Sequence, residues 1–395
     1  MKILMIAPQP FFQPRGTPFS VYYRLQALSQ LGHEIDLVTY PFGRDIFIHR
    51  VEIYRSWRPP FIKGIKIGPS FPKLILDIFL FLKAAVLLAK NPYDCIHTHE
   101  EGSFLGAILN KFFKYPHVYD MHSSLPEQLH NFGLISSGRV IRYLEILERW
   151  VLKYSSVVIA ICPYLVEKVA RLAPDKKSVL IENTSNLAEE DLSGRDAEAR
   201  KLRKELNLDH QLIVLYTGTL EPYQGIDLLL ESIGHVTKKF RGAKFLLVGG
   251  TEAQIRTWGE VADALGVRES ILFTGQRPVE EMPIFLKLSD ILVSPRKNGT
   301  NTPLKIYAYI SSGKPIVATN LLTHTQVLSP DVAVLTEPDP EDFARGILEL
   351  IQNPSLRAQL GQNALNLSKT KYNYETYLAR TAEVYKLISG AGGEQ

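Results

Sequence analysis

The chain has 395 residues, of which 45% are hydrophobic and 22% are charged, and its formal net charge is +4. Its length favours two domains, and its composition is that of an ordinary globular protein. The small net charge, and basic residues that are joined to no recognition motif, exclude nucleic acid as an expected partner. Cys95 and Cys162 lie in apolar, strand-like segments and read as buried thiols, which excludes a disulfide framework or a cysteine metal site.

Short runs of Val, Ile and Leu alternate with longer helical patterns along the chain, beginning with residues 2–7, which predict a strand rather than a signal peptide. Continuous apolar strands that alternate with helices are typical of parallel sheets covered on both faces. We expect strands at residues 3–7, 34–40, 95–99, 117–120, 157–161 and 178–181, and then at residues 213–217, 244–248, 271–273, 291–294 and 315–318.

The alternation breaks once, at residues 187–210, which are highly charged and predict no strand. We therefore expect an α/β protein with two doubly wound, Rossmann-like domains that face each other across a cleft. The domains comprise residues 1–190 and 191–374, and a C-terminal helix at about 375–390 packs back on the first of them. Ligands of such sheets bind at the carboxyl ends of the strands.

Residues 291–330 contain no Asp or Glu but carry Arg296, Lys297, Lys305 and Lys314. The pattern predicts a strand, a polar loop, a helix at about 303–312 and a second strand, with the positive charge where strand passes into helix. A helix N-terminus offers unpaired N–H groups, so lysines without carboxylates around it favour an anion, especially a phosphate. The alternative is a solvated loop that lacks acids by chance.

Residues 50–90 carry eight basic residues against Glu52 and Asp77, and within them residues 74–89 form a strongly apolar helix candidate. This candidate is too short and too charged to span a bilayer. It could lie on an anionic membrane surface, or it could be an ordinary core helix preceded by a basic loop. Both interpretations stay open at the level of sequence.

Several other chemistries are disfavoured by the sequence. The turn after the first strand has one glycine, Gly16, and so lacks the three-glycine dinucleotide motif; neither a Walker-type phosphate loop nor a Gly-x-Ser-x-Gly elbow occurs. His97 and His99 flank Thr98 at a strand end, where we expect them to point to opposite faces, so no metal site is expected from this pair.

Several motifs in the first half occur in a characteristic order. Arg15-Gly16-Thr17 precedes a helix and strand that end in Leu31-Gly-His-Glu-Ile-Asp-Leu-Val-Thr39, and Asp94-Cys-Ile-His-Thr-His99, Asp120-Met-His122, Val158-Ile-Ala-Ile-Cys-Pro163 and Val179-Leu-Ile-Glu-Asn183 follow. These motifs resemble the first domain of GT-B fold retaining glycosyltransferases of the family-four (glycosyl transferases group 1) type.

The second half resembles the same family. Tyr216-Thr-Gly-Thr-Leu-Glu-Pro-Tyr-Gln-Gly225 is similar to its Gly-Arg-Leu-x-x-x-Lys-Gly motif, and Phe273-Thr-Gly-Gln276 to its base-binding turn. The run from Pro303-Leu-Lys-Ile-Tyr307 to Gly313-Lys-Pro315 resembles the helix that ends its paired-glutamate motif. The resemblance thus extends nearly from end to end.

The chain departs from the family at four charged positions. The diphosphate-binding Arg and Lys fall at Thr219 and Gln224, and the two glutamates at Ala308 and at Thr300, or Asn298 in another alignment of the loop. The donor site has therefore been rebuilt or has decayed. We favour a rebuilt site, in which Arg296, Lys297 and Lys305, with the helix N-terminus near Leu304, hold the phosphates.

The resemblance implies a nucleotide-sugar donor in the second domain, an acceptor on the first, and transfer with retention of configuration. The leaving phosphate would accept the proton, so neither a protein nucleophile, a metal nor a separate cofactor is implied. His122 would act on the transferred sugar; otherwise it is a satisfied histidine at a strand end. The residues implied in donor binding are Gly16, Gly218, Thr219, Gln224, Gly275, Gln276, Arg296, Lys297, Thr300, Thr302, Pro303, Leu304 and Lys305, and those on the acceptor side are Thr17, His99 and Glu100.

Three functional hypotheses follow. The first is a cytoplasmic glycosyltransferase, peripheral at the inner face of the membrane if residues 50–90 bind lipid, that builds a glycolipid or polysaccharide. The second is a non-catalytic GT-B subunit that binds a nucleotide or a partner enzyme, because the four family charges are replaced. The third, a nucleotide-sugar epimerase, ranks last because it needs acid/base carboxylates, which residues 291–330 lack.

Overall fold

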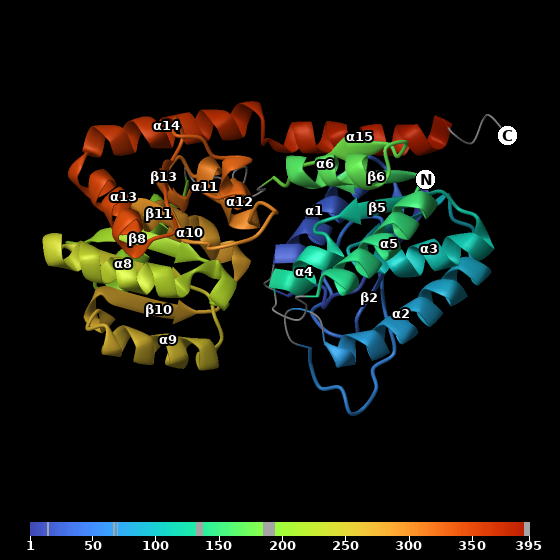
Figure 1. The fold of residues 1–395 in the computed structure, drawn as a ribbon, viewed down its shortest axis with the longest axis horizontal. Coiled ribbons are helices and arrows are strands. Elements are labelled where there is room, and N and C mark those ends of the chain that lie inside the picture. Colours follow the sequence, from blue (N-terminus) through green and yellow to red (C-terminus); the bar gives the residue numbers. More distant parts are fainter. Residues whose placement is uncertain (14–15, 66–67, 69, 132–136, 185–193, 391–395) are drawn as a thin grey trace. The chain divides into compact units, whose positions relative to one another are not determined.

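The computed structural model describes residues 1–13, 16–65, 68, 70–131, 137–184 and 194–390 (Figure 1). Arg15 and Lys66, and residues 187–193 of the expected boundary segment, lie outside these ranges. The chain forms two compact units: the first combines Met1–Asn183 with the C-terminal segment that starts at Glu375, and the second comprises Thr184–Tyr374. The chain thus divides after Asn183, where the sequence suggested residue 190.

The first unit is built on a seven-stranded parallel sheet. Its strands lie in the order β3 (Val51–Arg55), β2 (Glu34–Thr39), β1 (Lys2–Ala7), β4 (Cys95–His99), β5 (His117–Met121), β6 (Val157–Ala160) and β7 (Ser178–Leu180). Its helices are α1 (Gly16–Gln30), α2 (Phe71–Lys90), α3 (Gly102–Phe113), α4 (Leu125–Asn131), α5 (Gly138–Tyr154), α6 (Pro163–Leu172) and nearly all of α15 (Tyr374–Gly390).

The second unit repeats the design with a six-stranded parallel sheet (Figure 1). The strand order is β10 (Ile271–Gly275), β9 (Ala243–Val248), β8 (Leu212–Thr217), β11 (Ile291–Ser294), β12 (Ile316–Thr319) and β13 (Val334–Thr336). The helices are α7 (Asp196–Glu205), α8 (Ile226–Lys239), α9 (Glu252–Ala264), α10 (Met282–Leu288), α11 (Leu304–Ser311), α12 (Leu322–Thr325), α13 (Pro340–Gln352) and α14 (Pro354–Thr370).

Alternation along each strand places one core on either side of the second sheet. Val214 and Tyr216 belong to the core shared with α8, α9 and α13, whereas Ile213 and Leu215 belong to the core shared with α10 and α11. All four side chains are buried, because a parallel sheet with helices on both faces has no solvated face. The doubly wound architecture expected from the sequence is therefore confirmed.

In each sheet the strand order reverses at one point, between β1 and β4 in the first and between β8 and β11 in the second. The loops that leave the carboxyl ends of such a strand pair run in opposite directions and leave room for a ligand. The loops after β4 and β8 begin at Glu100 and Gly218, and the loop after β11 contains Arg296. Most of the candidate functional residues thus gather at the two switch points, whereas His122 follows β5, and Gly275 and Gln276 lie at the end of the edge strand β10.

Every strand expected from the sequence is present, with its ends shifted by at most two residues. Two strands were missed. β3 has the sequence Val-Glu-Ile-Tyr-Arg, in which charged residues interrupt the apolar run because it is an edge strand, and β13 has only three residues. Among the described helices, none combines the length and apolar character required to cross a membrane.

Candidate active site

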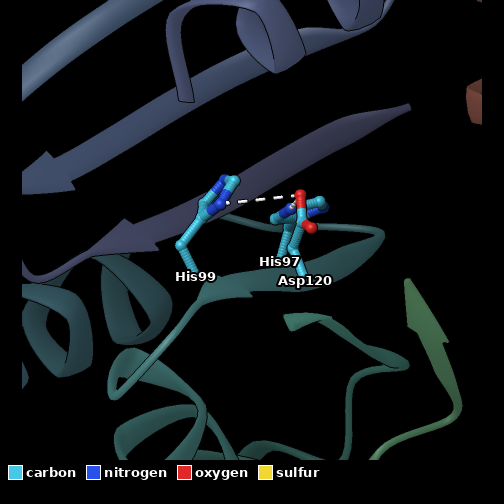
Figure 2. Close-up of side chains that lie close together, drawn as sticks. All are labelled: His97, His99 and Asp120. Atoms are coloured by element: carbon cyan, nitrogen blue, oxygen red, sulfur yellow. Dashed lines mark ion pairs between the residues drawn. The ribbon is translucent and has the colours of Figure 1, made fainter. Parts of the chain in front are cut away.

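Side chains of β4 and β5 form a buried cluster at the carboxyl edge of the first sheet. His99 of β4 is the register partner of Asp120 in β5. Asp120 Oδ2 lies 3.4 Å from His97 Nε2 and 3.5 Å from His99 Nδ1, and Figure 2 shows both rings beside the carboxylate. Our expectation that His97 and His99 point to opposite faces is wrong, because residues two apart in a strand share one face.

Two further nitrogen-bearing side chains contact the Asp120 carboxylate. His122, just beyond β5, places its Nε2 atom 3.2 Å from Asp120 Oδ1. Arg24 of α1 donates a hydrogen bond from Nε to Asp120 Oδ2 at 3.0 Å, and both side chains are no more than 2% exposed. One buried carboxylate thus serves a guanidinium and three imidazoles.

Burial and the charge of Asp120 shift the pKa values of the three histidines in opposite directions. Burial alone would raise the pKa of Asp120, but Arg24 and the neighbouring histidines hold it well below its usual range. Burial lowers the pKa of His97 and of His99, although Asp120 opposes the effect. At His122, Asp120 overcomes the effect of burial and raises the pKa. His122 is therefore the ring of the cluster that most readily carries a proton.

His97, His99 and Asp120 place three potential ligand atoms within 4.8 Å of one another, which is a spacing that a metal ion could use. Arg24 argues against this use. Its guanidinium already occupies the Asp120 oxygen that faces both histidines, and a divalent cation at that oxygen would be repelled by a buried positive charge. We therefore interpret the cluster as an electrostatic network.

The residues named for the acceptor side lie around the same edge. Thr17 donates a hydrogen bond to Glu100 Oε1 at 3.5 Å. Glu100 has a left-handed backbone (φ 46°), and burial with the nearby Glu101 raises its pKa to about 7. A Cβ at Gly16 would meet nothing within 4 Å, so close packing does not require a glycine at the start of α1.

The cationic residues of the second unit differ in how they are neutralised. Lys297 forms an exposed ion pair with Asp227. Within the described part of the chain, Arg296 donates to two neutral oxygens, the carbonyl of Asn301 and the hydroxyl of Thr323, each at 3.1 Å. The Nζ atom of Lys305 is buried and has no hydrogen-bond partner among the described residues, although the residue as a whole is partly exposed.

Lys305 lies in the first turn of α11 and points along the loop that follows β8. Its Nζ is 3.8 Å from the centre of the Tyr216 ring and would be 3.3 Å from a Cβ at Gly218. Burial, together with the positive charge of Arg296, holds the pKa of Lys305 well below its usual range. A positive charge at Lys305 thus lacks the counter-ion that a buried ammonium requires.

Two glycines let the surrounding loops approach closely. A Cβ at Gly225, where φ is 76°, would lie 1.9 Å from the carbonyl oxygen of Pro295, so the loop after β8 packs directly on the loop after β11. A Cβ at Gly249 would lie 1.9 Å from the carbonyl oxygen of Gly218. Gly249 also donates to the Gly275 carbonyl at 2.8 Å, beside the exposed Gln276.

Other polar atoms of these loops are also buried without a partner among the described residues. They are Thr219 Oγ1, Gln224 Oε1, Arg296 Nε and Thr302 Oγ1. Pro303 is the N-cap of α11, which has no side-chain cap, and Leu304 is its first residue. Thr300 accepts at its carbonyl from Gln326 at 2.8 Å, and Ala308 packs against the core. A polar ligand at this edge would satisfy the first group of atoms.

Several residues of both clusters were not identified from the sequence. Arg24 is flanked by Tyr23 and Leu25 on a largely buried helix, and a lone arginine in such a position is the signal that it has a buried partner. Tyr385 of α15 lies with its hydroxyl 2.7 Å from His97 Nδ1, and no local pattern identifies it. The Arg296 guanidinium carbon lies 5.3 Å from the centre of the Tyr223 ring.

Two family models match consecutive parts of the chain. Glycosyltransferase Family 4 matches residues 14–189, and Glycosyl transferases group 1 matches residues 198–367. Among similar proteins, an uncharacterised glycosyltransferase of Methanocaldococcus jannaschii is 24% identical over 98% of each chain. The alpha-D-kanosaminyltransferase of Streptomyces kanamyceticus is 23% identical over 74% of this chain and 77% of its own.

Solved structures show the same architecture. Sucrose-phosphate synthase from Thermosynechococcus elongatus superposes with a TM-score of 0.81 at 21% identity, covering 99% of this chain and 100% of that one. HepE of Anabaena, solved in complex with UDP-glucose, gives a TM-score of 0.73 at 18% identity, covering 98% and 99%. The two parallel-sheet units define a GT-B fold. With both family models matched, the chain belongs to the family-four, group 1 type of glycosyltransferases.

Proposed function

We propose that the protein transfers a sugar, with retention of configuration, from a nucleotide-sugar donor held by the second unit to a glycolipid or polysaccharide acceptor. The observation that carries the proposal is the Lys305 ammonium group, which is buried beside Gly218 without a partner among the described residues. HepE, a similar structure solved with UDP-glucose, supports the class of donor.

The donor diphosphate fits the unpartnered atoms of the second unit. A buried polar group without a partner costs free energy, and a buried charge without a counter-ion costs more. Lys305 and Arg296 offer positive charge, Thr219 and Thr302 offer hydroxyls, and the N-terminus of α11 offers unpaired N–H groups. This set replaces the arginine and lysine that the family carries at the positions of Thr219 and Gln224.

The chemistry of the transfer follows from these charges. As the bond between the sugar and the diphosphate stretches, negative charge develops on the leaving phosphate, and the fixed donors around Lys305 stabilise it. The acceptor hydroxyl attacks the same face of the sugar and gives its proton to the leaving phosphate, so that configuration is retained. His122, whose pKa is raised by Asp120, donates a hydrogen bond to the transferred sugar.

A thermal-shift screen of nucleotide sugars, followed by chromatography of the reaction, tests the donor. We expect one nucleotide sugar to raise the melting temperature and to be consumed when an acceptor is present, and NMR of the product to show the anomeric configuration of the donor. Lys305→Met should lose the thermal shift, whereas the matched control Lys297→Met should keep it, because Lys297 already has Asp227 as its partner. The absence of any shift across the screen contradicts the proposal.

A second candidate function is a non-catalytic subunit that binds a nucleotide or a partner enzyme. It is favoured by the loss of all four family charges, at Thr219, Gln224, Thr300 and Ala308. A nucleotide sugar that raises the melting temperature but is not consumed with any acceptor, including lipid-linked sugars, would select this candidate.

Helix α2 supports a lipid-linked acceptor. Its core side chains, among them Leu76, Leu80 and Ala84, are buried, yet a second apolar stripe is 48% to 73% exposed and consists of Phe71, Leu74, Ile78, Leu82 and Val86. The single acid of α2, Asp77, accepts a hydrogen bond from Tyr40 at 2.6 Å, and burial raises its pKa to about 6. The exposed stripe is therefore apolar and is accompanied by basic residues.

We propose that α2 and the basic segment before it lie on the anionic inner face of a membrane, in a cytoplasmic protein. The exposed Arg58 and Lys63 and the partly exposed Lys73 supply the charge, each worth about 1 kcal/mol near anionic lipid. Vesicle co-sedimentation tests the idea. We expect the protein to bind anionic but not neutral vesicles, and to lose this binding at high salt or when Arg58, Lys63 and Lys73 are all replaced by Gln. Wild-type protein that stays in the supernatant at low salt contradicts it, and a soluble acceptor then becomes the better proposal.

A further inference from the structure

The Asp120 carboxylate lies between His122 and the rest of the buried network. Its Oδ1 atom faces His122 Nε2 at 3.2 Å, and its Oδ2 atom accepts from Arg24 Nε at 3.0 Å. Carboxylate and guanidinium are both fully enclosed, so neither can exchange its partner for water. The orientation of the Asp120 side chain is therefore fixed by Arg24, and its Oδ1 charge lies in a fixed place beside His122 Nε2, which also lies 3.3 Å from His99 Nδ1.

Side chains of the C-terminal helix α15 contact Arg24 and His97, the two residues that lie on the other side of Asp120 from His122. Arg24 Nη1 donates to Thr381 Oγ1 at 2.7 Å, and the guanidinium stacks 4.7 Å above the Tyr377 ring. The hydroxyl of Tyr385 lies 2.7 Å from His97 Nδ1. His97 Nε2 faces Asp120 Oδ2 at 3.4 Å, and the tautomer of His97 that carries its proton on Nε2 suits this carboxylate; in that tautomer the Tyr385 hydroxyl donates to Nδ1.

We infer that Asp120 is a positioning residue for His122, which orients the imidazole and stabilises its protonated form, and that Arg24 and α15 keep Asp120 in place for this task. The inference rests on the proposed function, in which His122 contacts the transferred sugar. It assigns to the C-terminal helix a role in the chemistry, exerted through Arg24 and His97.

The charged and titratable groups around His122 support the assignment. Asp120 comes from β5, His97 and His99 from β4, Glu100 from the residue after β4, and Arg24 from α1. Burial disfavours a charged His122, Asp120 favours it most, Glu100 favours it less, and Arg24 opposes it. Removal of Asp120 should therefore reverse the balance.

Arg24 is required although it repels a protonated His122. Burial alone would raise the pKa of Asp120 and favour a neutral carboxylic acid, which could no longer stabilise a charged ring. The guanidinium keeps Asp120 ionised. Arg24 thus repels a protonated His122 weakly, but it keeps a permanent negative charge on Asp120, 3.2 Å from His122 Nε2.

Histidine-ring NMR of the full chain tests the inference without any need for activity. The resonance that is absent in His122→Gln identifies His122, and we expect its titration midpoint above 6.5, the usual value for an exposed histidine. Asp120→Asn should lower the midpoint by about one pH unit or more. Glu148→Gln is the matched control: Glu148 is another buried carboxylate of the first unit, ion-paired with Lys168 at 3.8 Å, and the midpoint should stay in place.

The double variant Arg24→Met with Asp120→Asn carries no unpaired buried charge and serves where the single variant does not fold. Its midpoint should also fall, by less than in the single variant. An unchanged midpoint, or an equal fall in Glu148→Gln, overturns the assignment of Asp120.

In the transfer assay, kcat should decrease at high pH, and in Asp120→Asn this decrease should begin at a lower pH while KM for the donor is unchanged. A midpoint that moves as expected in a chain that transfers no sugar upholds the assignment and counts against the proposed function.

Discussion

The two charged clusters of the molecule are built in opposite ways. Around Asp120, a single carboxylate is contacted by Arg24 and three histidines, and every charge has a partner. Around Lys305, positive charge gathers without a carboxylate within ion-pair distance among the described residues, and the Nζ atom is left without a hydrogen bond. Each charge of the first cluster thus has an ionic partner in the free protein, and we propose that an anion supplies the partner that Lys305 lacks among the described residues.

The difference separates positioning from binding. A complete network holds its side chains in one arrangement and so can orient a reacting group. An incomplete one destabilises the free protein and recovers that free energy if a ligand supplies the missing charge, which is the role we propose for the cluster around Lys305. Changes at the two clusters should therefore have different consequences for stability, turnover and affinity.

The largest expected effect is on stability at the first cluster. Asp120→Asn leaves Arg24 as an unpaired buried charge and should lower the free energy of unfolding of the first unit by about 3–5 kcal/mol. Lys305→Met removes a buried amine whose charged form has no counter-ion among the described residues, and it should leave the second unit as stable as before, or more so. Hydrogen exchange followed by mass spectrometry reports each unit separately, and equal losses in the two variants contradict the comparison.

The next effect is on turnover. His122→Ala should lower kcat by about a hundredfold or more, the usual scale for loss of a positioned proton donor, and should change nucleotide affinity little. The reason is that the role proposed for His122 is on the transferred sugar and not on the diphosphate. Steady-state kinetics together with calorimetry distinguish the two quantities. Parallel losses in both would indicate a binding or structural role.

A smaller effect is expected on affinity at the second cluster. Lys305→Ala should weaken nucleotide binding by about 1–3 kcal/mol, the scale of a hydrogen bond to a charged group. Thr219→Ala should matter less, since it removes a neutral hydroxyl. Lys297→Ala, with its partner Asp227 already satisfying it, is the control and should bind like the wild type. If calorimetry shows that Lys305→Ala binds the nucleotide as tightly as the wild type does, the proposal of a rebuilt donor site is wrong.

The smallest effect is a pH dependence of binding. The pKa of Lys305 is lowered in the free protein, and a bound diphosphate would raise it, so binding takes up a proton. Affinity is then highest below the lowered pKa and falls as the pH rises through it. Calorimetry in buffers of different ionisation enthalpy measures the uptake, which should vanish in Lys305→Ala. A wild-type protein with pH-independent affinity and no proton uptake speaks against a charged Lys305–phosphate contact.

Local pattern was enough for the strands and for part of the second cluster. Apolar runs identified the buried strands, because a parallel sheet with both faces covered needs them, and the absence of acids between residues 291 and 330 located Arg296 and Lys305. The same pattern treated Lys297 as equivalent. It is neutralised by Asp227, which lies 70 residues away along the chain, and no window of sequence contains that pair.

The sequence by itself determined the alternation of strands and helices, the two units, and the placement of cations at a strand-to-helix turn, because these depend on residues close together in the chain. Only the tertiary structure decided which charges are paired. Arg24 meets Asp120 across 96 residues, and Tyr385 meets His97 across 288. Pairing in a buried site depends on distances of a few ångströms between distant segments, so the distinction between an orienting network and an anion site exists only in the folded chain.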